Sequence, residues 1–172
     1  MTSGPLDGDS IRKLVLDTPP LMQDYLDLAE QVQPNGFDLT LMELGELTSA
    51  GSMGRGPDQR ELSLVNKIQS EQDGWLRLPP GTYLITFREI VHLPLNLMAL
   101  GRPRSSLLRS GVSVHTAVWD AGYRGRSQAM LLVSNPLGYS VQLGARLMQL
   151  VFFRLAQPTS EGYQGRYREE NI

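Results

Sequence analysis

The stretch Leu78-Pro79-Pro80-Gly81-Thr82-Tyr83-Leu84-Ile85-Thr86-Phe87 carries the clearest signal for the fold. After the turn-forming prolines and glycine, the apolar side chains of Tyr83, Ile85 and Phe87 alternate with their neighbours, which is the period of a β-strand. The same alternation recurs, bounded by Gly, Pro or Asn, at Phe37, Leu39 and Leu41, at Leu76 and Leu78, at Val112 and Val114, and less strictly at Leu147, Leu150 and Phe152. Many short strands at close spacing predict a mainly β chain, built as a sandwich, a barrel or a jelly roll.

Two helical patterns precede the strands. Residues 9–16 place apolar side chains on one face, with Asp9 or Ser10 as the expected cap, and residues 21–31 show a second short pattern. Residues 48–60 and 157–172, rich in Gly and polar side chains, are expected to be loops. Because neither a repeat nor a linker is evident, we expect one domain over residues 1–172.

Composition excludes several kinds of protein. The 172 residues contain no cysteine, so disulfides, zinc–thiolate sites and cysteine nucleophiles are excluded, and a cytoplasmic location is expected. The formal charge of −2, without a basic block, argues against a nucleic-acid binder and favours a small ligand bound by a few placed arginines. No apolar run approaches the ~20 residues of a membrane span, so we expect a soluble protein with no membrane partner.

Two short motifs carry chemistry. Arg104-Ser105-Ser106-Leu107 offers hydroxyl groups and guanidinium donors to a polyphosphate. The stretch Asp120-Ala121-Gly122-Tyr123-Arg124-Gly125 sets a carboxylate beside an aromatic ring on a glycine-bounded turn. Together they provide for the phosphates and the nucleoside of a nucleotide.

These motifs resemble those of the dUTPase and dCTP deaminase superfamily, particularly its deaminase-like branch, which includes archaeal-type dUTPases. The matching stretches, in chain order, are Gln33 to Leu39, the strand pair Leu78 to Leu84 and Ile90 to Pro94, Arg104 to Leu107 with Arg109, Asp120 to Gly125, Gly144 to Leu150, and Tyr163 to Arg166. Several matches in the right order are specific, whereas any one of them alone would be weak.

The resemblance implies a jelly-roll-like distorted β-barrel, a homotrimer with active sites at subunit interfaces, and Mg²⁺ carried in by the triphosphate rather than held by a protein metal site. It also implies one of two activities, or both: hydrolysis of dUTP to dUMP and pyrophosphate, or deamination of dCTP. In the deaminases a glutamate shuttles protons at the position that falls here on Met130, and a thioether cannot do so. Neighbouring Ser127 and Gln128 cannot replace that glutamate either.

The same resemblance assigns roles at the second and third motifs. Asp120 is expected to activate the attacking water as a general base, although an Asp before Ala-Gly can also simply initiate a turn. Tyr123, next to the turn residue Gly122, would stack on the deoxyribose; alternatively it is a half-buried strand aromatic. Arg104, Ser105, Ser106 and Arg109 would meet the phosphates, with an interface ion pair as the alternative for Arg109.

The last candidate residues lie in the closing third of the chain. Gln149 would contact phosphate or anchor a strand, with a satisfied buried amide as the alternative. Tyr163, Gln164 and Arg166 resemble a flexible segment, expected over residues 157–172, that closes over bound nucleotide; the alternative is a frayed end. His115 is interpreted as structural.

We therefore expect a dUTP diphosphatase that uses Mg²⁺ with its substrate. Two alternatives remain open: a dCTP deaminase or bifunctional enzyme with a relocated proton shuttle, and a non-catalytic trimer that binds nucleotide.

Overall fold

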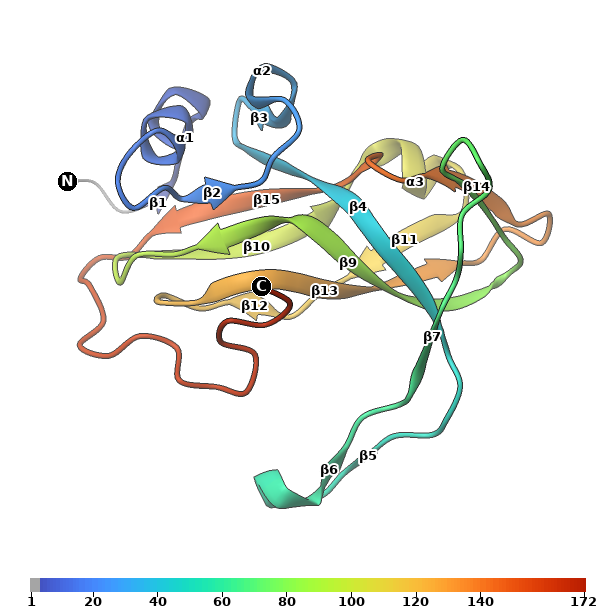
Figure 1. Cartoon of the computed structure of the whole chain (residues 1–172). Helices are drawn as coiled ribbons and strands as arrows, with labels where there is room; N and C mark the ends of the chain where they lie inside the picture. The colour runs from blue at the N-terminus through green and yellow to red at the C-terminus, as the bar shows by residue number, and fades with distance from the viewer. Residues whose placement is uncertain (1–3) are drawn as a thin grey trace.

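The computed structural model describes residues 4–172, the side chain of Pro57 excepted, and consists mainly of antiparallel strands (Figure 1). The helices are α1 (Gly8–Val15), α2 (Leu28–Gln31) and α3 (Ser105–Arg109), with a 3₁₀ turn, η1, at Pro57–Gln59. The longer strands are β4 (Gly36–Leu47), β9 (Gly81–His92), β10 (Leu97–Pro103), β13 (Arg124–Val133) and β15 (Arg146–Arg154). The shorter ones are β1 (Gly4–Pro5), β2 (Met22–Gln23), β3 (Val32–Gln33), β5 (Ser52–Met53), β6 (Arg60–Glu61), β7 (Val65–Lys67), β8 (Trp75–Leu78), β11 (Val112–His115), β12 (Val118–Trp119) and β14 (Tyr139–Gln142).

The strands curl into one large sheet around a single apolar core. Neighbouring strands follow the order β11-β13-β9-β4-β15-β10-β12, with β8 and β14 forming a separate pair. Three of the largest fully buried side chains, Phe37, Phe87 and Phe152, come from β4, β9 and β15 in the middle of this order. The mainly β chain predicted from the alternating pattern, and the jelly-roll-like fold implied by the resemblance, are therefore confirmed.

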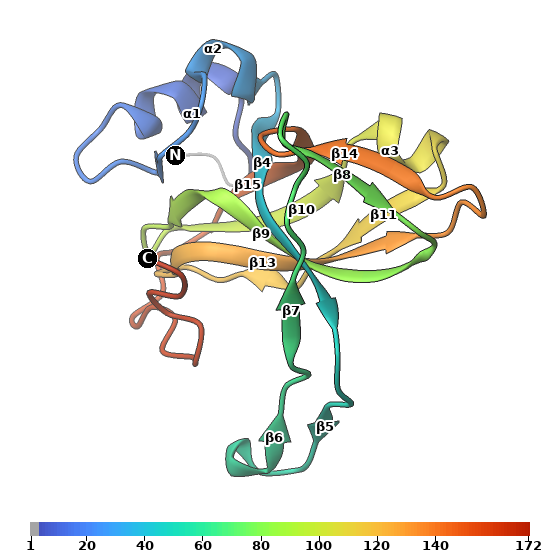
Figure 2. The ribbon, with the colours of Figure 1, turned by 45° about the vertical axis from the view of Figure 1, so that its right-hand side comes forward.

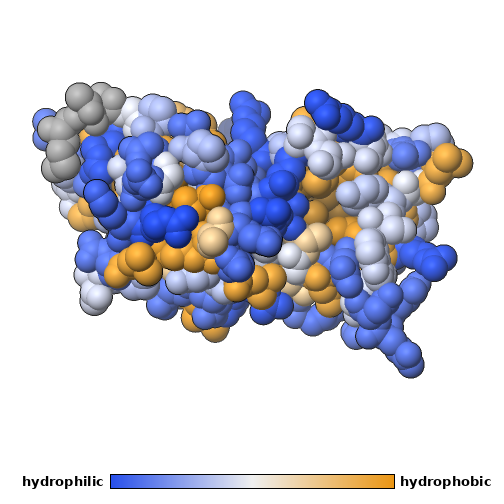
Figure 3. Space-filling model, turned by 90° about the horizontal axis from the view of Figure 1, so that it is seen from above, coloured by the Kyte–Doolittle hydropathy of each residue, from blue (hydrophilic) through white to orange (hydrophobic). Residues whose placement is uncertain are grey.

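The two N-terminal helices cover one end of the curled sheet. In α1 the cap is Asp7, whose carboxylate accepts a hydrogen bond from the Ser10 backbone N–H at 2.9 Å, so the helix begins before the expected Asp9 or Ser10 cap. Seen from above, the face that carries the helices is mostly hydrophilic, with smaller apolar patches between the polar ones (Figure 3).

The helical prediction for residues 21–31 was wrong over most of its length. Met22 pairs with Val91 of β9, and only Leu28–Gln31 are helical. Helix α2 begins late because Asp27 caps it, accepting hydrogen bonds from the backbone of Ala29 and Glu30.

The loop predicted over residues 48–60 is only partly a loop. Ser52–Met53 pairs with Arg60–Glu61 around η1, and this small hairpin extends β4 and β7 into an arm that projects away from the sheet (Figure 2). We call residues 48–64 the arm. Its root borders the cavity described below.

Candidate active site

A cavity of about 740 Å³ opens beside β13. Its wall comes from four parts of the chain: the root of the arm, strands β4, β7 and β9, the segment from Ala117 to Tyr123 with the first half of β13, and the C-terminal tail. Asp120, Tyr123 and Tyr163, all predicted to be functional, therefore line one space.

Asp120 stands at the start of a tight turn. Its backbone carbonyl accepts a hydrogen bond from the Tyr123 N–H at 3.1 Å, and Gly122 adopts a φ of +81° that an L side chain rarely tolerates. The Asp120 side chain is exposed and also borders a second, smaller cavity of about 390 Å³. The backbone thus makes the turn, while the carboxylate stays accessible to a ligand.

Tyr123 is buried at the wall of the cavity. Its hydroxyl donates a hydrogen bond to Glu170 Oε1 at 2.8 Å, and the ring of Tyr163 meets it edge-on, with 5.8 Å between centroids. Burial raises the pKa of Tyr123 well above its ordinary value, and the nearby Glu170 carboxylate adds to this rise. Burial also raises the pKa of Glu170, partly opposed by the hydrogen bond from Tyr123. The phenol is therefore held as a hydrogen-bond donor.

The C-terminal tail packs against its own chain at this point. The backbone N–H of Tyr163 donates to the Ala121 carbonyl at 2.8 Å, that of Glu169 to Arg124 at 2.7 Å, and that of Arg126 to Glu170 at 3.0 Å. Gln164 and Arg166 are exposed on the outside of the tail. The structure thus brings Tyr163 to Asp120 and Tyr123, whereas movement of the tail on nucleotide binding stays a prediction.

The other predicted residues gather at α3. The Arg104 guanidinium pairs with the buried carboxylate of Asp38, and Arg146 Nη1 lies 3.6 Å from the same oxygen. Burial lowers the pKa of Arg104 from its ordinary value, and the neighbouring Arg146 lowers it further. Arg146 Nη2 also lies 3.8 Å from Glu30 Oε2, so the two guanidinium groups face two carboxylates, and the exposed Arg109 adds a further cation on α3.

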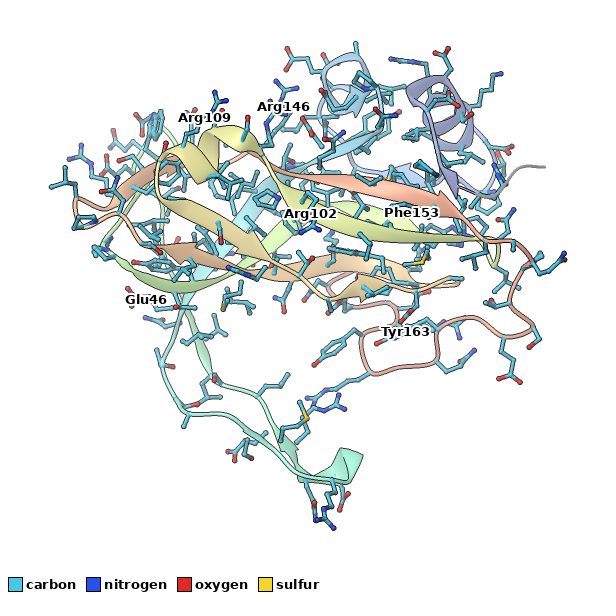
Figure 4. All side chains as sticks on the ribbon, turned by 180° about the vertical axis from the view of Figure 1, so that it is seen from behind. Glu46, Arg102, Arg109, Arg146, Phe153 and Tyr163 are labelled. Carbon is cyan, nitrogen blue, oxygen red and sulfur yellow. The ribbon has the colours of Figure 1, made fainter. Side chains whose placement is uncertain are left out.

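Within one chain the two groups are far apart. Arg109 and Arg146 lie on one side of the curled sheet and Tyr163 on the other (Figure 4). Ser105, Ser106 and Arg109 are exposed on α3. Gln149 faces the glycine at position 36, where its Cγ lies 2.7 Å from the place that a Cβ would take. A single chain therefore does not bring the residues expected to bind phosphate to Asp120.

The sequence analysis missed the partners that hold the α3 group. Asp38 was part of a recognised motif, but its ion pairs with Arg104 and Arg146 were not foreseen. The sequence did indicate that Asp38 has a cationic partner, because a charged residue within the apolar run of β4 requires a compensating charge. Its partner could not be named, since Arg104 is 66 positions away.

A second buried polar network, also missed, lies between β4 and β9. Glu89 is fully buried; its Oε1 accepts hydrogen bonds from Gln31 Nε2 and Thr40 Oγ1, both at 2.7 Å, and its Oε2 accepts one from the Thr40 N–H at 2.9 Å. Burial raises the pKa of Glu89, while these hydrogen bonds oppose the rise. The network ties α2 to the sheet and lies outside the cavity.

Met130 lies exposed on β13, opposite His115 of β11 and Leu84 of β9. The ring of His115 is also exposed, with Nε2 2.7 Å from Ser113 Oγ. Among residues 4–172, no group of three or more His, Asp and Glu side chains could hold a metal ion. Nor does any helix in the described part of the chain have the length and apolar character to cross a membrane.

The family model for dCTP deaminase-like proteins matches residues 6–155. The chain belongs to this family. It is 45% identical over 166 residues to a protein of Methanosarcina mazei named "Probable deoxyuridine 5'-triphosphate nucleotidohydrolase", covering 96% of this chain and 97% of the relative. A protein of the same name from Archaeoglobus fulgidus is 45% identical over 167 residues, 97% of each chain.

A solved structure supports the same family. The 2'-deoxycytidine 5'-triphosphate deaminase of Agrobacterium tumefaciens superposes with a TM-score of 0.71 at 27% identity. The match covers 90% of this chain but 49% of that one, so this chain spans about half of the deaminase.

Proposed function

We propose that this protein is a dUTP nucleotidohydrolase, which cleaves dUTP to dUMP and pyrophosphate by attack of water on the α-phosphorus. One observation carries the proposal: Asp120 and Tyr123, the carboxylate and ring of the third motif, line the same cavity. Similarity over nearly the whole length to archaeal proteins named as dUTP nucleotidohydrolases supports it.

The proposed chemistry follows from the exposed Asp120 carboxylate. A carboxylate within reach of a bound water can orient that water and take its proton as the bond to phosphorus forms. Tyr123, three residues further on the same turn, offers a ring to the deoxyribose; a face packed against C2′ would leave no room for a ribose hydroxyl. Mg²⁺ would arrive with the triphosphate, whose charge it neutralises.

The separation of the two groups within one chain supports a second part of the proposal. We infer that the α3 group, with Arg104, Ser105 and Arg109, serves the cavity of a neighbouring copy in a homotrimer, with Gln149 at its side. This arrangement supplies cationic donors to the triphosphate beside Asp120. Arg104 would then have two tasks, because it also compensates the buried Asp38 carboxylate.

Deamination of dCTP is the second candidate, favoured by the likeness to the Agrobacterium deaminase. Met130 opposes it, since no proton can be exchanged there. The ionisable side chain directly across from Met130 is His115, which makes that imidazole one candidate for a relocated proton shuttle.

The decisive experiment incubates the purified protein with Mg²⁺ and either dUTP or dCTP, and measures pyrophosphate and ammonia in the same samples. Pyrophosphate from dUTP without ammonia from dCTP is the expected result. Ammonia from dCTP that disappears in His115→Ala would instead establish the deaminase, and neither product would favour a protein that only binds nucleotide.

A further inference from the structure

The cavity has polar groups that the proposed chemistry does not use. Beyond Tyr123 its wall includes Ser127, Gln128, Thr86 and Trp119. Ser127 Oγ and Trp119 Nε1 are buried and have no hydrogen-bond partner among the described residues. Because buried polar groups are nearly always paired, this part of the wall suits a ligand that is itself polar.

An irregularity in the sheet lies beside two consecutive residues that border the cavity, and its extra residues are on β9. The register between β13 and β9 shifts between Arg126 and Gln128, and Ser127 and Gln128 both line the cavity. In a regular strand, consecutive side chains point to opposite faces. Ser127 is buried and Gln128 is exposed, so β13 keeps this alternation, and the exposed Gln128 side chain at the cavity is a candidate for a contact with substrate.

Gln128 borders the same cavity as Tyr123, further along β13. The Tyr123 ring extends along β13, since its hydroxyl lies 2.8 Å from the place where a Cβ on Gly125 would stand. Asp120, Tyr123 and Gln128 therefore follow one another along the cavity, with about 3.3 Å of strand per residue between the last two. This order matches the α-phosphate, the sugar and the base of a nucleotide.

The amide of Gln128 is held in place and only partly used. Its Nε2 donates a hydrogen bond to Thr86 Oγ1 at 3.0 Å, which leaves the second N–H and both lone pairs of Oε1 for a ligand. The edge of uracil presents an N3–H donor beside the O4 acceptor. A planar amide can pair with both at once, as glutamine does with adenine in DNA.

We propose that Gln128 is a specificity-determining residue that pairs with the N3–H and O4 edge of uracil and is oriented by Thr86. This inference rests on the proposed function, because it assumes that the nucleotide lies on Tyr123 with its phosphates at Asp120. It assigns a side chain of β13 to recognition of the base.

The test measures affinity without turnover. Calorimetry with the α,β-imido analogues of dUTP and dCTP gives Kd values for the parent protein, Gln128→Leu and Gln128→Glu. The leucine removes both hydrogen bonds, so the Kd of the dUTP analogue should rise about tenfold. The glutamate offers acceptors only, so it should repel O4 and accept from the cytosine amino group. The ratio of dUTP to dCTP affinity should then fall by at least about tenfold in Gln128→Glu.

Gln142→Leu is the matched control, because Gln142 also bonds through Nε2, here to the Asp73 carbonyl at 2.8 Å, but lies outside the cavity. It should change neither Kd. Thermal melting checks that each variant folds. If Gln128→Glu does not fold, the Kd values of Gln128→Leu decide the test.

A change below threefold in Gln128→Leu, an equal loss for both analogues, or no binding by the folded parent would overturn the inference. Failure of the proposed function would appear separately, as binding of the dUTP analogue by a parent protein that releases no pyrophosphate from dUTP.

Discussion

A methyl group at Gly122 should release the C-terminal tail from the cavity. A Cβ built on Gly122 would stand 2.5 Å from Gly162 Cα and 3.0 Å from the Tyr163 backbone nitrogen. Both atoms belong to the backbone of the tail, which cannot turn aside as a flexible side chain would. In Gly122→Ala we therefore expect the tail to lose its position next to the turn.

The size of the effect follows from the contacts that would be lost. They are the hydrogen bond from Tyr163 to the Ala121 carbonyl and the edge-on packing of Tyr163 on Tyr123. A hydrogen bond and an aromatic pair are each worth about 1 kcal/mol, so tail docking should weaken by about 2 kcal/mol, roughly a 30-fold shift in its equilibrium. Positive φ adds strain of about 1 kcal/mol to the domain as a whole.

Limited trypsin cleavage measures the released tail, because Arg166 and Arg168 are exposed within it. Mass spectrometry should show that cleavage at these residues is at least tenfold faster in Gly122→Ala than in the parent protein. Gly144→Ala is the control: Gly144 has the same φ of +81°, but its Cβ would approach only the Leu26 side chain, at 3.3 Å. Equal cleavage rates in the two variants would refute the argument that Gly122 makes room for the tail.

Four further results are expected. Asp120→Asn should keep dUTP binding but lose ~10²-fold or more in kcat; turnover within a few-fold of the parent would leave Asp120 as a turn residue only. Tyr123→Ala should relax discrimination against UTP more than it weakens dUTP binding, and an unchanged ratio of kcat/KM for the two nucleotides would contradict a role in sugar selection. Glu89→Gln should lower the free energy of unfolding by about 1–3 kcal/mol, because an amide N–H would face one of the donors that now point at the carboxylate. Since burial raises the pKa of Glu89 above its ordinary 4.5, the folded state holds the proton longer than the unfolded chain, so urea titrations should show the parent's advantage over Glu89→Gln shrinking as pH rises through the raised pKa. The parent protein at high concentration should release no ammonia from dCTP, because Met130 cannot exchange protons, and sustained ammonia would contradict the hydrolase assignment.

Local patterns in the sequence determined a large part of the architecture. The alternation at Tyr83, Ile85 and Phe87 predicts β9, because a strand with a buried face needs apolar residues at every second position. The order of the motifs likewise predicted the family. The helix predicted over residues 21–31 was wrong over most of its length, because Asp27 caps a helix that begins only at Leu28, while Met22 pairs with β9.

Tertiary structure decided how distant residues meet. Asp38 and Arg104 form their ion pair across 66 positions, and Glu170 reaches Tyr123 across 47, contacts that no local periodicity encodes. The same holds for the register shift beside Ser127 and Gln128, since it depends on how β9 pairs with β13. Sequence therefore determined which chemical groups this protein has and on which kind of element each lies. Only the packing of strands far apart in the chain decided that Asp120, Tyr123 and Gln128 share one cavity while the arginines of α3 lie across the sheet. The physical reason is that strand register and ion pairing depend on contacts between elements, which no single element encodes.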